Sequence, residues 1–480
     1  MPKGLHTISI DRLIILLIFS LYSPYLIAQS ETGAADFAVV KDIQISGNRK
    51  TRARVILREM DVSIGDTIRV EDIGQILERN KKYIFNTSLF QEAHINVTNW
   101  STSNHEMTLD IKVVEDLYIY PIPIFSLADR NFNVWWKQYN RSLERVNYGM
   151  RFYNFNSTGN QDRLKVVAQF GFQKKYELAY NRPNFNKSQT LGINNIIRYS
   201  SLKEVNYATI DDVQEFIKDE ESSLFQTFLV KSELTYRPSI NQYHTISFSY
   251  ARHQVGNLIA EDLNPDYFLA SRSDQKYFEF EYTFVNDQRD FRTYAERGSY
   301  QKFSLRKTGL GLFDDVNLFQ IEAIYAKYFS LHPKWSIEAF SKARVGLNRD
   351  KPPFFNYKAF GYNQNVIRGY ELYVIDAIDF GYIKTSLRFE LLNSKLSLGK
   401  AMPIRGFKMM PIRFMLTFNN DIGYANDPFY SSNNELSNQL LWGGGIGIDM
   451  ILYNDYVFQI EYSSNQLSEK GLFLKLKFPF

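Results

Sequence analysis

The chain ends in Leu472-Phe473-Leu474-Lys475-Leu476-Lys477-Phe478-Pro479-Phe480. In an extended segment the leucines and phenylalanines at even-numbered positions share one face, while Phe473, Lys475 and Lys477 share the other. This period of two predicts a β-strand with one wholly apolar face. At the edge of a soluble β-sandwich, which is the alternative, such a strand would expose aromatic surface to water. The stretch therefore favours a strand of a membrane β-barrel.

The same alternation recurs upstream, from residue 118 onward. The alternating segments are short and are separated by Asn, Asp, Ser, Gly and Pro, which is typical of strands joined by turns. About sixteen antiparallel strands are predicted, and an even number is what bacterial barrels close with. The predicted strands are 118–127, 145–154, 163–172, 176–180, 191–199, 227–236, 245–252, 277–285, 300–307, 319–329, 335–345, 380–391, 412–423, 444–452, 457–462 and 472–480. The fold class is mainly β, with a transmembrane barrel over residues 118–480.

The connections between these strands alternate in length. Those after odd-numbered strands are mostly long, and the one at about 348–378 is the longest, whereas those after even-numbered strands are mostly short. Long loops face the outside of outer-membrane barrels and short turns face the periplasm. The 393–410 connection is the exception, because it is long where the count predicts a turn. The alternation predicts that the first strand runs outward from the periplasm.

The N-terminus predicts export. Lys3 and Arg12 precede an apolar run over 13–27, and Ala28 follows, which is the pattern of a secretory signal peptide over residues 1–28. A retained anchor helix is the alternative, although the run is short for a spanning helix. Aromatic residues make up 16% of the chain, chiefly Phe and Tyr, which is typical of the aromatic girdles of barrels. We therefore expect the protein in the cell outer membrane.

Composition excludes several functions. The chain has no cysteine, so it has no disulfide, thiolate metal site, cysteine nucleophile or lipidated cysteine. Its six histidines show no metal-ligand spacing on a predicted helix, so no metal and no cofactor are expected. A net charge of +4 is no footprint of nucleic-acid binding. No nucleophile with a base and no phosphate loop is present, so we predict that the protein is not an enzyme.

Residues 37–117 predict a separate small domain. An alternating strand at 39–46, helices at 52–60 and 71–85, and strands at 90–97 and 107–114 give the order β-α-α-β-β. The segment resembles a POTRA domain in three places: Ile43-x-Ile45-x-Gly47-Asn48, Gly65-Asp66 and Ser88-Leu89-Phe90. The resemblance implies a periplasmic module whose exposed strand edge pairs with an extended client. A generic α+β domain with a protected edge is the alternative.

One short motif lies in the longest loop, after predicted strand eleven: Ile367-Arg368-Gly369-Tyr370. Glycine permits a tight backbone turn, and a guanidinium suits a carboxylate. An ordinary exposed loop is the alternative. With the barrel and the single POTRA-like domain, the motif resembles the BamA/TamA-like outer-membrane assembly and secretion superfamily, the bacterial surface antigen family. A second Arg-Gly-Phe at 405–407 falls in a predicted periplasmic turn, so we interpret it as a chance match and not as the motif.

The resemblance implies specific partners for the motif. The loop is expected to fold back into the lumen, where Arg368 meets an acid on strand thirteen, here Asp421, with Glu390 as a second partner. The related pattern has an aromatic residue two positions before that acid, where this chain has Asn419. The terminal aromatics Phe478 and Phe480 resemble the C-terminal signal that barrel assembly machinery reads.

Three functions are compatible with this reading. The first is an assembly factor or insertase, which receives client strands through the POTRA domain and inserts them into the outer membrane. A secretion pore for a dedicated passenger is the alternative, and a porin-like diffusion barrel is the third. Pro121 and Pro123 in the first strand remove ladder donors, which fits a weakly closed seam or a misplaced first strand. The expected partners are outer-membrane lipids, unfolded outer-membrane clients or a passenger, and periplasmic or lipoprotein accessory subunits.

Overall fold

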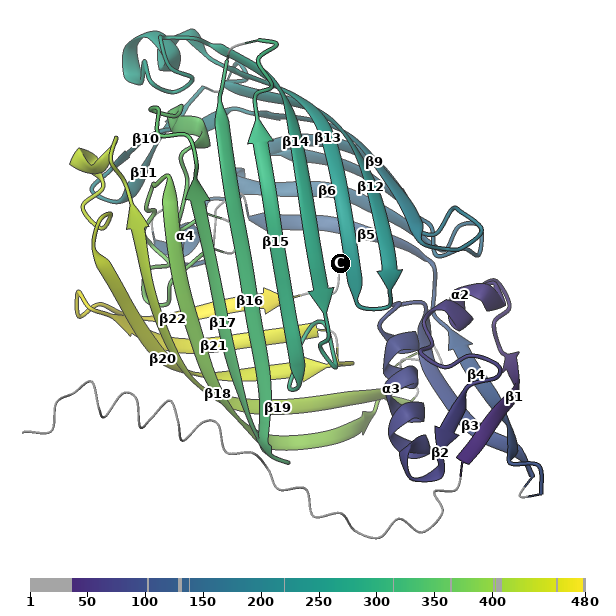
Figure 1. Cartoon of the computed structure of the whole chain (residues 1–480). Helices are drawn as coiled ribbons and strands as arrows, with labels where there is room; N and C mark the ends of the chain where they lie inside the picture. The colour runs from purple at the N-terminus through teal and green to yellow at the C-terminus, as the bar shows by residue number, and fades with distance from the viewer. Residues whose placement is uncertain are drawn as a thin grey trace, which may run out of the picture.

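A computed structural model describes residues 37–477, except 102, 128–131, 138, 220, 314, 363–364, 400–401, 403–407 and 455. The predicted signal segment, the Arg-Gly-Phe at 405–407, Phe478 and Phe480 lie outside these residues. The described chain forms a small N-terminal α+β domain beside a large curled sheet (Figure 1).

The described part of the N-terminal domain has four strands and two α-helices. In chain order these are β1 (Phe37–Ser46), α2 (Ala53–Arg58), β2 (Thr67–Arg69), α3 (Ile73–Phe85), β3 (Phe90–Ser101) and β4 (Glu106–Glu115). The strand order is β2-β1-β4-β3, with β1 parallel to β4 and the other pairs antiparallel. Apolar residues of the sheet and helices, among them Val40, Ile56, Ile84 and Leu109, form one buried core. The β-α-α-β-β order is as predicted, and the three-residue β2 is an addition.

Within the described residues the barrel sheet has sixteen strands, which pair in chain order except that β9 is followed by β12. They are β5 (Ile119–Leu127), β6 (Val146–Phe155), β7 (Arg163–Gly171), β8 (Gln173–Arg182), β9 (Leu191–Leu202), β12 (Phe225–Ser239), β13 (Gln242–Val255), β14 (Asp274–Asp287), β15 (Gly298–Thr308), β16 (Leu318–His332), β17 (Trp335–Gly346), β18 (Asp379–Ser397), β19 (Met409–Asn426), β20 (Leu440–Leu452), β21 (Tyr456–Asn465) and β22 (Lys470–Lys477). All ladders are antiparallel, so the predicted count and fold class are confirmed.

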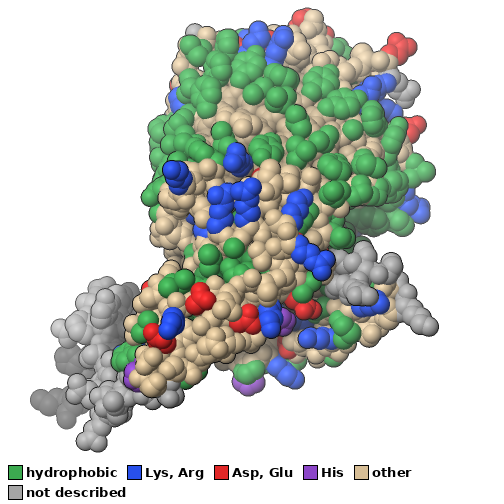
Figure 2. Space-filling model, turned by 90° about the vertical axis from the view of Figure 1, so that its right-hand side faces the viewer, with side chains coloured by type: hydrophobic (Ala, Val, Ile, Leu, Met, Phe, Trp, Pro, Cys, Tyr) green, Lys and Arg blue, Asp and Glu red, His purple; other side chains and the backbone are tan. Residues whose placement is uncertain are grey.

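Alternation sorts the barrel side chains into two faces. On β22 the leucines at 472, 474 and 476 are exposed on the outside, whereas Phe473 is buried. On β19 Phe418 and Ile422 face outward, while Thr417, Asn419 and Asp421 are buried inside. In Figure 2 hydrophobic side chains cover much of the barrel face, and charged ones gather toward the N-terminal domain. None of the helices in the described residues is long and apolar enough to cross a membrane.

The structure adds two features to the predicted strands. A hairpin, β10 (Glu204–Ile210) with β11 (Val213–Lys218), lies inside the connection that the sequence predicted as a long loop. The other feature is the long 393–410 connection, most of whose described part is strand. There β18 and β19 pair as far as Ser397 and Met409. The side chains of residues 391–397 are all exposed, so the alternation of buried and exposed side chains that predicts a strand is missing in this segment.

Three turns of the barrel hold the N-terminal domain, and we call the end where they lie the near mouth. The Arg52 N–H donates to Gly159 O in the β6–β7 turn at 3.0 Å. Both oxygens of Glu59 accept from Arg237, at the β12–β13 turn, at 2.7 Å. Phe291 of the β14–β15 connection meets Phe85 edge to face. The domain therefore sits against the near mouth (Figure 1).

Candidate functional site

Buried apolar residues anchor the loop between β17 and β18 (residues 347–378) against the barrel. Ile367 and Tyr370 are 1% and 2% exposed and pack with Phe360, Phe380 and Leu441. Gly369 between them has φ +81, a conformation that glycine adopts at little cost. A Cβ on Gly369 would lie 2.8 Å from the Asn465 Cβ, so no larger residue fits without a shift. The loop is thus packed tightly against the barrel wall.

The guanidinium of Arg368 joins the loop to three strands, β18, β19 and β21. Its Nη1 forms an ion pair with Asp421 on β19, and its backbone N–H donates to the same carboxylate at 3.1 Å. Its Nε donates to Glu461 Oε2 on β21 at 2.8 Å. Its Nη2 donates to Ser386 Oγ at 3.4 Å. Because the Asp421 side chain is 0% exposed and that of Arg368 14%, the pair is a buried latch rather than a surface contact.

Two lysines complete the network and balance its charge. Lys384 lies 3.6 Å from the Asp421 carboxylate. Lys475, on the last strand, lies 3.4 Å from Glu461 and 3.1 Å from Glu371, which directly follows the motif. Three cations thus face three carboxylates, so the network is fully paired. A balanced, buried network positions the loop and offers no group poised for bond-making chemistry.

The structure brings Arg368 and Asp421 together, whereas Glu390 is not a partner of Arg368. Glu390 accepts from Arg413 Nε at 2.9 Å, two lumen-facing positions beyond Ser386 on β18, and is too far along the strand to reach the loop. The second carboxylate is Glu461, which the sequence reasoning missed. Alternation on β21 places Glu461 on the lumen face and could have indicated it. Asn419, at the position expected to be aromatic, donates to Glu461 Oε2 at 2.6 Å.

The loop also holds the last hairpin of the barrel, β21–β22. Asn465 Nδ2 donates to Gly369 O at 2.8 Å, and Tyr373 OH donates to Glu469 Oε1 at 2.7 Å. With the Glu371–Lys475 pair, these contacts reach both strands and the turn between them. The latch loop therefore positions the terminal strand as well as β19.

The seam of the sheet lies between β5 and β22. Within the described residues β5 forms a ladder only with β6, and β22 only with β21. Proline in sheets is confined to edges and bulges, and Pro121 and Pro123 lie on β5. Helix α4 (Phe132–Lys137), in the β5–β6 connection, lies beside β22. Among the described residues β5 and β22 are thus the two end strands of the sixteen-stranded sheet.

The barrel end opposite the near mouth is covered by interlocked loops. Thr209 Oγ1 of β10 donates to Asp376 Oδ2 at 2.6 Å, and Tyr362 OH donates to Asp376 Oδ1 at 2.8 Å. Asp212, in the β10–β11 turn, accepts from the Leu436 N–H at 3.0 Å. Burial raises the pKa of Asp376 to about 6 and that of Asp212 to about 6. These carboxyls tie the latch loop to the hairpin and to the β19–β20 loop.

Comparison with protein families agrees with this geometry. The Omp85 superfamily domain matches residues 154–448, and the POTRA family, described as surface antigen variable number repeat, matches residues 38–116. The chain belongs to the Omp85 superfamily. Members are non-enzymatic membrane assembly or transport proteins of the outer membrane. Within the described residues no group of His, Cys, Asp and Glu could hold a metal ion.

Solved structures share the Omp85 architecture. BamA from Haemophilus ducreyi lacking POTRA domains 1–3 has a TM-score of 0.51 at 12% identity, covering 92% of this chain and 84% of that one. CdiB from Escherichia coli has a TM-score of 0.54 at 10% identity, covering 92% and 76%. A search of curated proteins found no match. At these identities the likeness concerns the fold, which the superfamily uses for BamA insertases and for two-partner secretion pores such as CdiB.

Proposed function

We propose that this protein is an outer-membrane assembly factor that receives client β-strands through its POTRA domain and helps to insert them into the membrane. The observation that carries the proposal is the seam, where β5 and β22 each have one ladder partner among the described residues. An end strand can add a further strand to the sheet, and a client strand that pairs there satisfies its own N–H and C=O groups as it enters the hydrocarbon.

The POTRA domain supplies a second edge. Its sheet ends in the twelve-residue β3 on one side and the three-residue β2 on the other. The long edge suits the capture of an extended segment by backbone hydrogen bonds. We place this domain in the periplasm. A cysteine introduced by Arg69→Cys in this cysteine-free chain would then react with a membrane-impermeant maleimide only after the outer membrane is permeabilised. Labelling of intact cells would contradict the orientation.

The deciding experiment is reconstitution. Purified protein is placed in liposomes, unfolded outer-membrane clients are added, and client folding is followed with wild type, Arg368→Ala and Arg413→Ala. Arg413 is the matched control, since it also pairs with two lumen carboxylates but lies outside the latch. We expect wild type and the Arg413 variant to accelerate folding and the Arg368 variant to do so much less.

A correctly folded wild type that gives no acceleration would move the assignment to the alternative, a secretion pore for a dedicated passenger. A seam test separates the two further. A disulfide joining one introduced cysteine in β5 to one in β22 should abolish insertion of clients, because the cross-link would prevent the two strands from separating to pair with a client strand. Undiminished insertion by the cross-linked protein would reject the seam as the site of assembly.

A further inference from the structure

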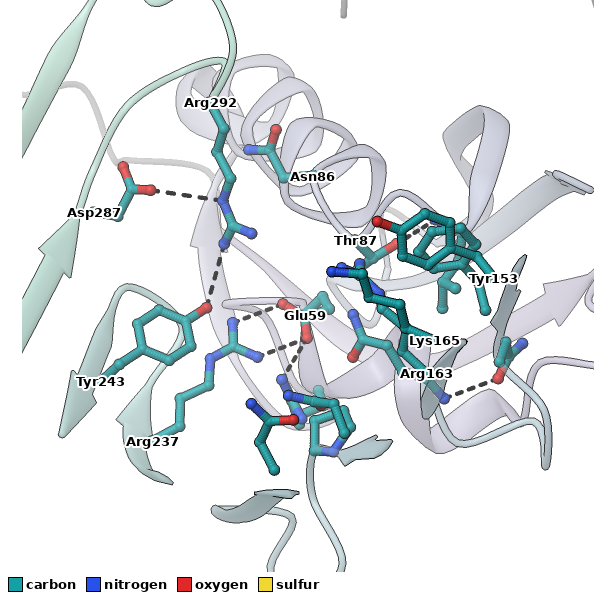
Figure 3. A pocket seen from close by; sticks show the side chains of 18 of the residues that line it. Glu59, Asn86, Thr87, Tyr153, Arg163, Lys165, Arg237, Tyr243, Asp287 and Arg292 are labelled. Atoms are coloured by element: carbon teal, nitrogen blue, oxygen red, sulfur yellow. Dashed lines mark hydrogen bonds and ion pairs between the residues drawn. The ribbon is translucent and has the colours of Figure 1, made fainter. Parts of the chain in front are cut away.

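A cavity of about 540 Å³ lies between the POTRA domain and the near mouth of the barrel (Figure 3). It is lined by the ends of α2 and α3 and by β7, β8, β9 and the turns that dock the domain. Sites of this size are typical of small-molecule binding. None of the functions argued above uses it.

The charge of this lining is strongly unbalanced. Three carboxylates, Glu59, Glu177 and Asp287, face seven cations. The cations are Arg58, Arg163, Lys165, Arg198, Arg237, Arg289 and Arg292. Four positive charges therefore remain in excess on the cavity wall. A concave, low-dielectric wall of one sign concentrates its field on the enclosed volume and attracts counter-ions.

The excess is located on particular guanidiniums. No carboxylate of the described residues lies within ion-pair distance of Arg163, which stacks on Phe155 with its Cζ 4.5 Å from the ring centre. Arg58 contacts Glu59 through Nη2 at 2.8 Å, while its buried Nε and Nη1 have no hydrogen-bond partner in the described structure. Burial lowers the pKa of Arg58, as expected for a cation that its neighbours compensate only in part.

The other five cations of the lining each form an ion pair with a carboxylate. In Figure 3 Arg237 reaches Glu59 and Arg292 reaches Asp287 and Tyr243 on one side of the pocket, with Arg163 and Lys165 on the other. Glu59 and Asp287 are thus occupied by two arginines each. These carboxylates are engaged elsewhere, so none of them neutralises Arg163, which lines the cavity.

We propose that this cavity binds a phosphate group. Guanidinium forks match phosphate oxygens, and a phosphate monoester carries about −1.5 to −2 charge at pH 7, more than one carboxylate supplies. The volume leaves room for the group to which the phosphate is attached. Such a ligand would bridge the POTRA domain, through Arg58, and the barrel, through Arg163, and would stabilise their docking.

The test uses the full chain in neutral detergent with pyrophosphate as the probe, measured by calorimetry in chloride buffer. The variants are Arg163→Gln, Arg58→Gln with Arg163→Gln, and Arg69→Gln. Arg69 is the matched control because it lies on β2 of the same domain, outside the cavity, with a side chain 59% exposed. We expect binding by wild type and the control, roughly tenfold weaker binding by the single variant and roughly a hundredfold loss in the double variant.

The single variant keeps the test valid if the double variant loosens the domain, because Arg163 makes no ion pair that docks it. Absence of pyrophosphate binding by wild type, or equal affinity in all variants, would overturn the proposal. A second arm uses nanodiscs of phosphatidylcholine with and without phosphatidic acid. Competition by phosphatidic acid assigns the phosphate to a lipid headgroup, and unchanged binding assigns it to a soluble phosphate.

Discussion

Replacing Arg368 by alanine is the most informative perturbation of the latch. The substitution removes one cation from a network of three cations and three carboxylates, and leaves a net negative charge beside Asp421 and Glu461. Their side chains are 0% and 8% exposed, so water screens this charge poorly. The motif in loop 347–378 also loses its ion pair with β19.

The expected magnitude follows from burial. Stranding a buried carboxylate costs about 3–5 kcal/mol. Lys384 at 3.6 Å and Lys475 at 3.4 Å remain and offset part of that, so we expect about 3 kcal/mol. Arg413→Ala is the comparison, since its partners Glu390 and Glu296 are 16% and 26% exposed. With that exposure we expect about 1 kcal/mol for the Arg413 variant.

Two measurements check this difference. Urea unfolding of the protein reconstituted in liposomes gives the free energies, and hydrogen exchange reports on peptides covering 365–375 and 461–475. We expect faster exchange in both segments for Arg368→Ala, because the loop holds the β21–β22 hairpin. A loss of less than 0.5 kcal/mol, or unchanged exchange at the hairpin, would refute the latch argument.

Three further predictions concern the cap, the loop turn and the docking interface. Burial raises the pKa of Asp376 to about 6 from about 4 in an unfolded chain, so the folded cap binds more protons between these values. The contribution of Asp376 to cap stability should therefore fall by about 3 kcal/mol as pH rises from 4 to 6, as followed by hydrogen exchange. Asp376→Asn should remove this contribution and leave that of Asp212, whose pKa is also raised to about 6. Gly369→Ala should lower the urea midpoint more than Gly65→Ala, since both glycines have positive φ but only at Gly369 would the Cβ meet another strand; equal effects would reject the steric argument. Glu59→Gln should free the POTRA domain by removing its bidentate contact with Arg237, seen as several-fold faster trypsin cleavage between domain and barrel, and unchanged cleavage would mean that the other turns suffice.

Sequence reasoning recovered the elements whose cause is local. An outward residue and an inward residue alternate on each barrel strand, so the pattern of β22 or β19 is visible in the chain itself. Consecutive strands pair, so order in the sheet follows order in the sequence. The β10–β11 hairpin escaped because its faces are mixed, although Asp211 and Asp212 in its turn, with φ of 51° and 61°, are residues that favour such turns.

The site divides in the same way. Arg368, Gly369 and Asp421 could be singled out from a motif and a strand count. The partner role of Glu461, 93 residues from Arg368, depends on how loop 347–378 folds into the lumen, which no local pattern specifies. Glu390 lies on the lumen face of β18, as predicted, but too far along the strand to reach Arg368. Alternation of side chains indicates which face a residue occupies and not its position along the lumen.

By itself the sequence determined the strand number, the inward and outward faces, the separate N-terminal domain and the motif, since each rests on neighbours in the chain. Tertiary structure alone decided which charges meet. The latch network, the seam between β5 and β22 and the cavity between the two domains all join segments far apart in sequence. Interactions between these charges are strongest where folding removes water from around them. Which charges lose their water depends on how the loop, the barrel and the POTRA domain pack together.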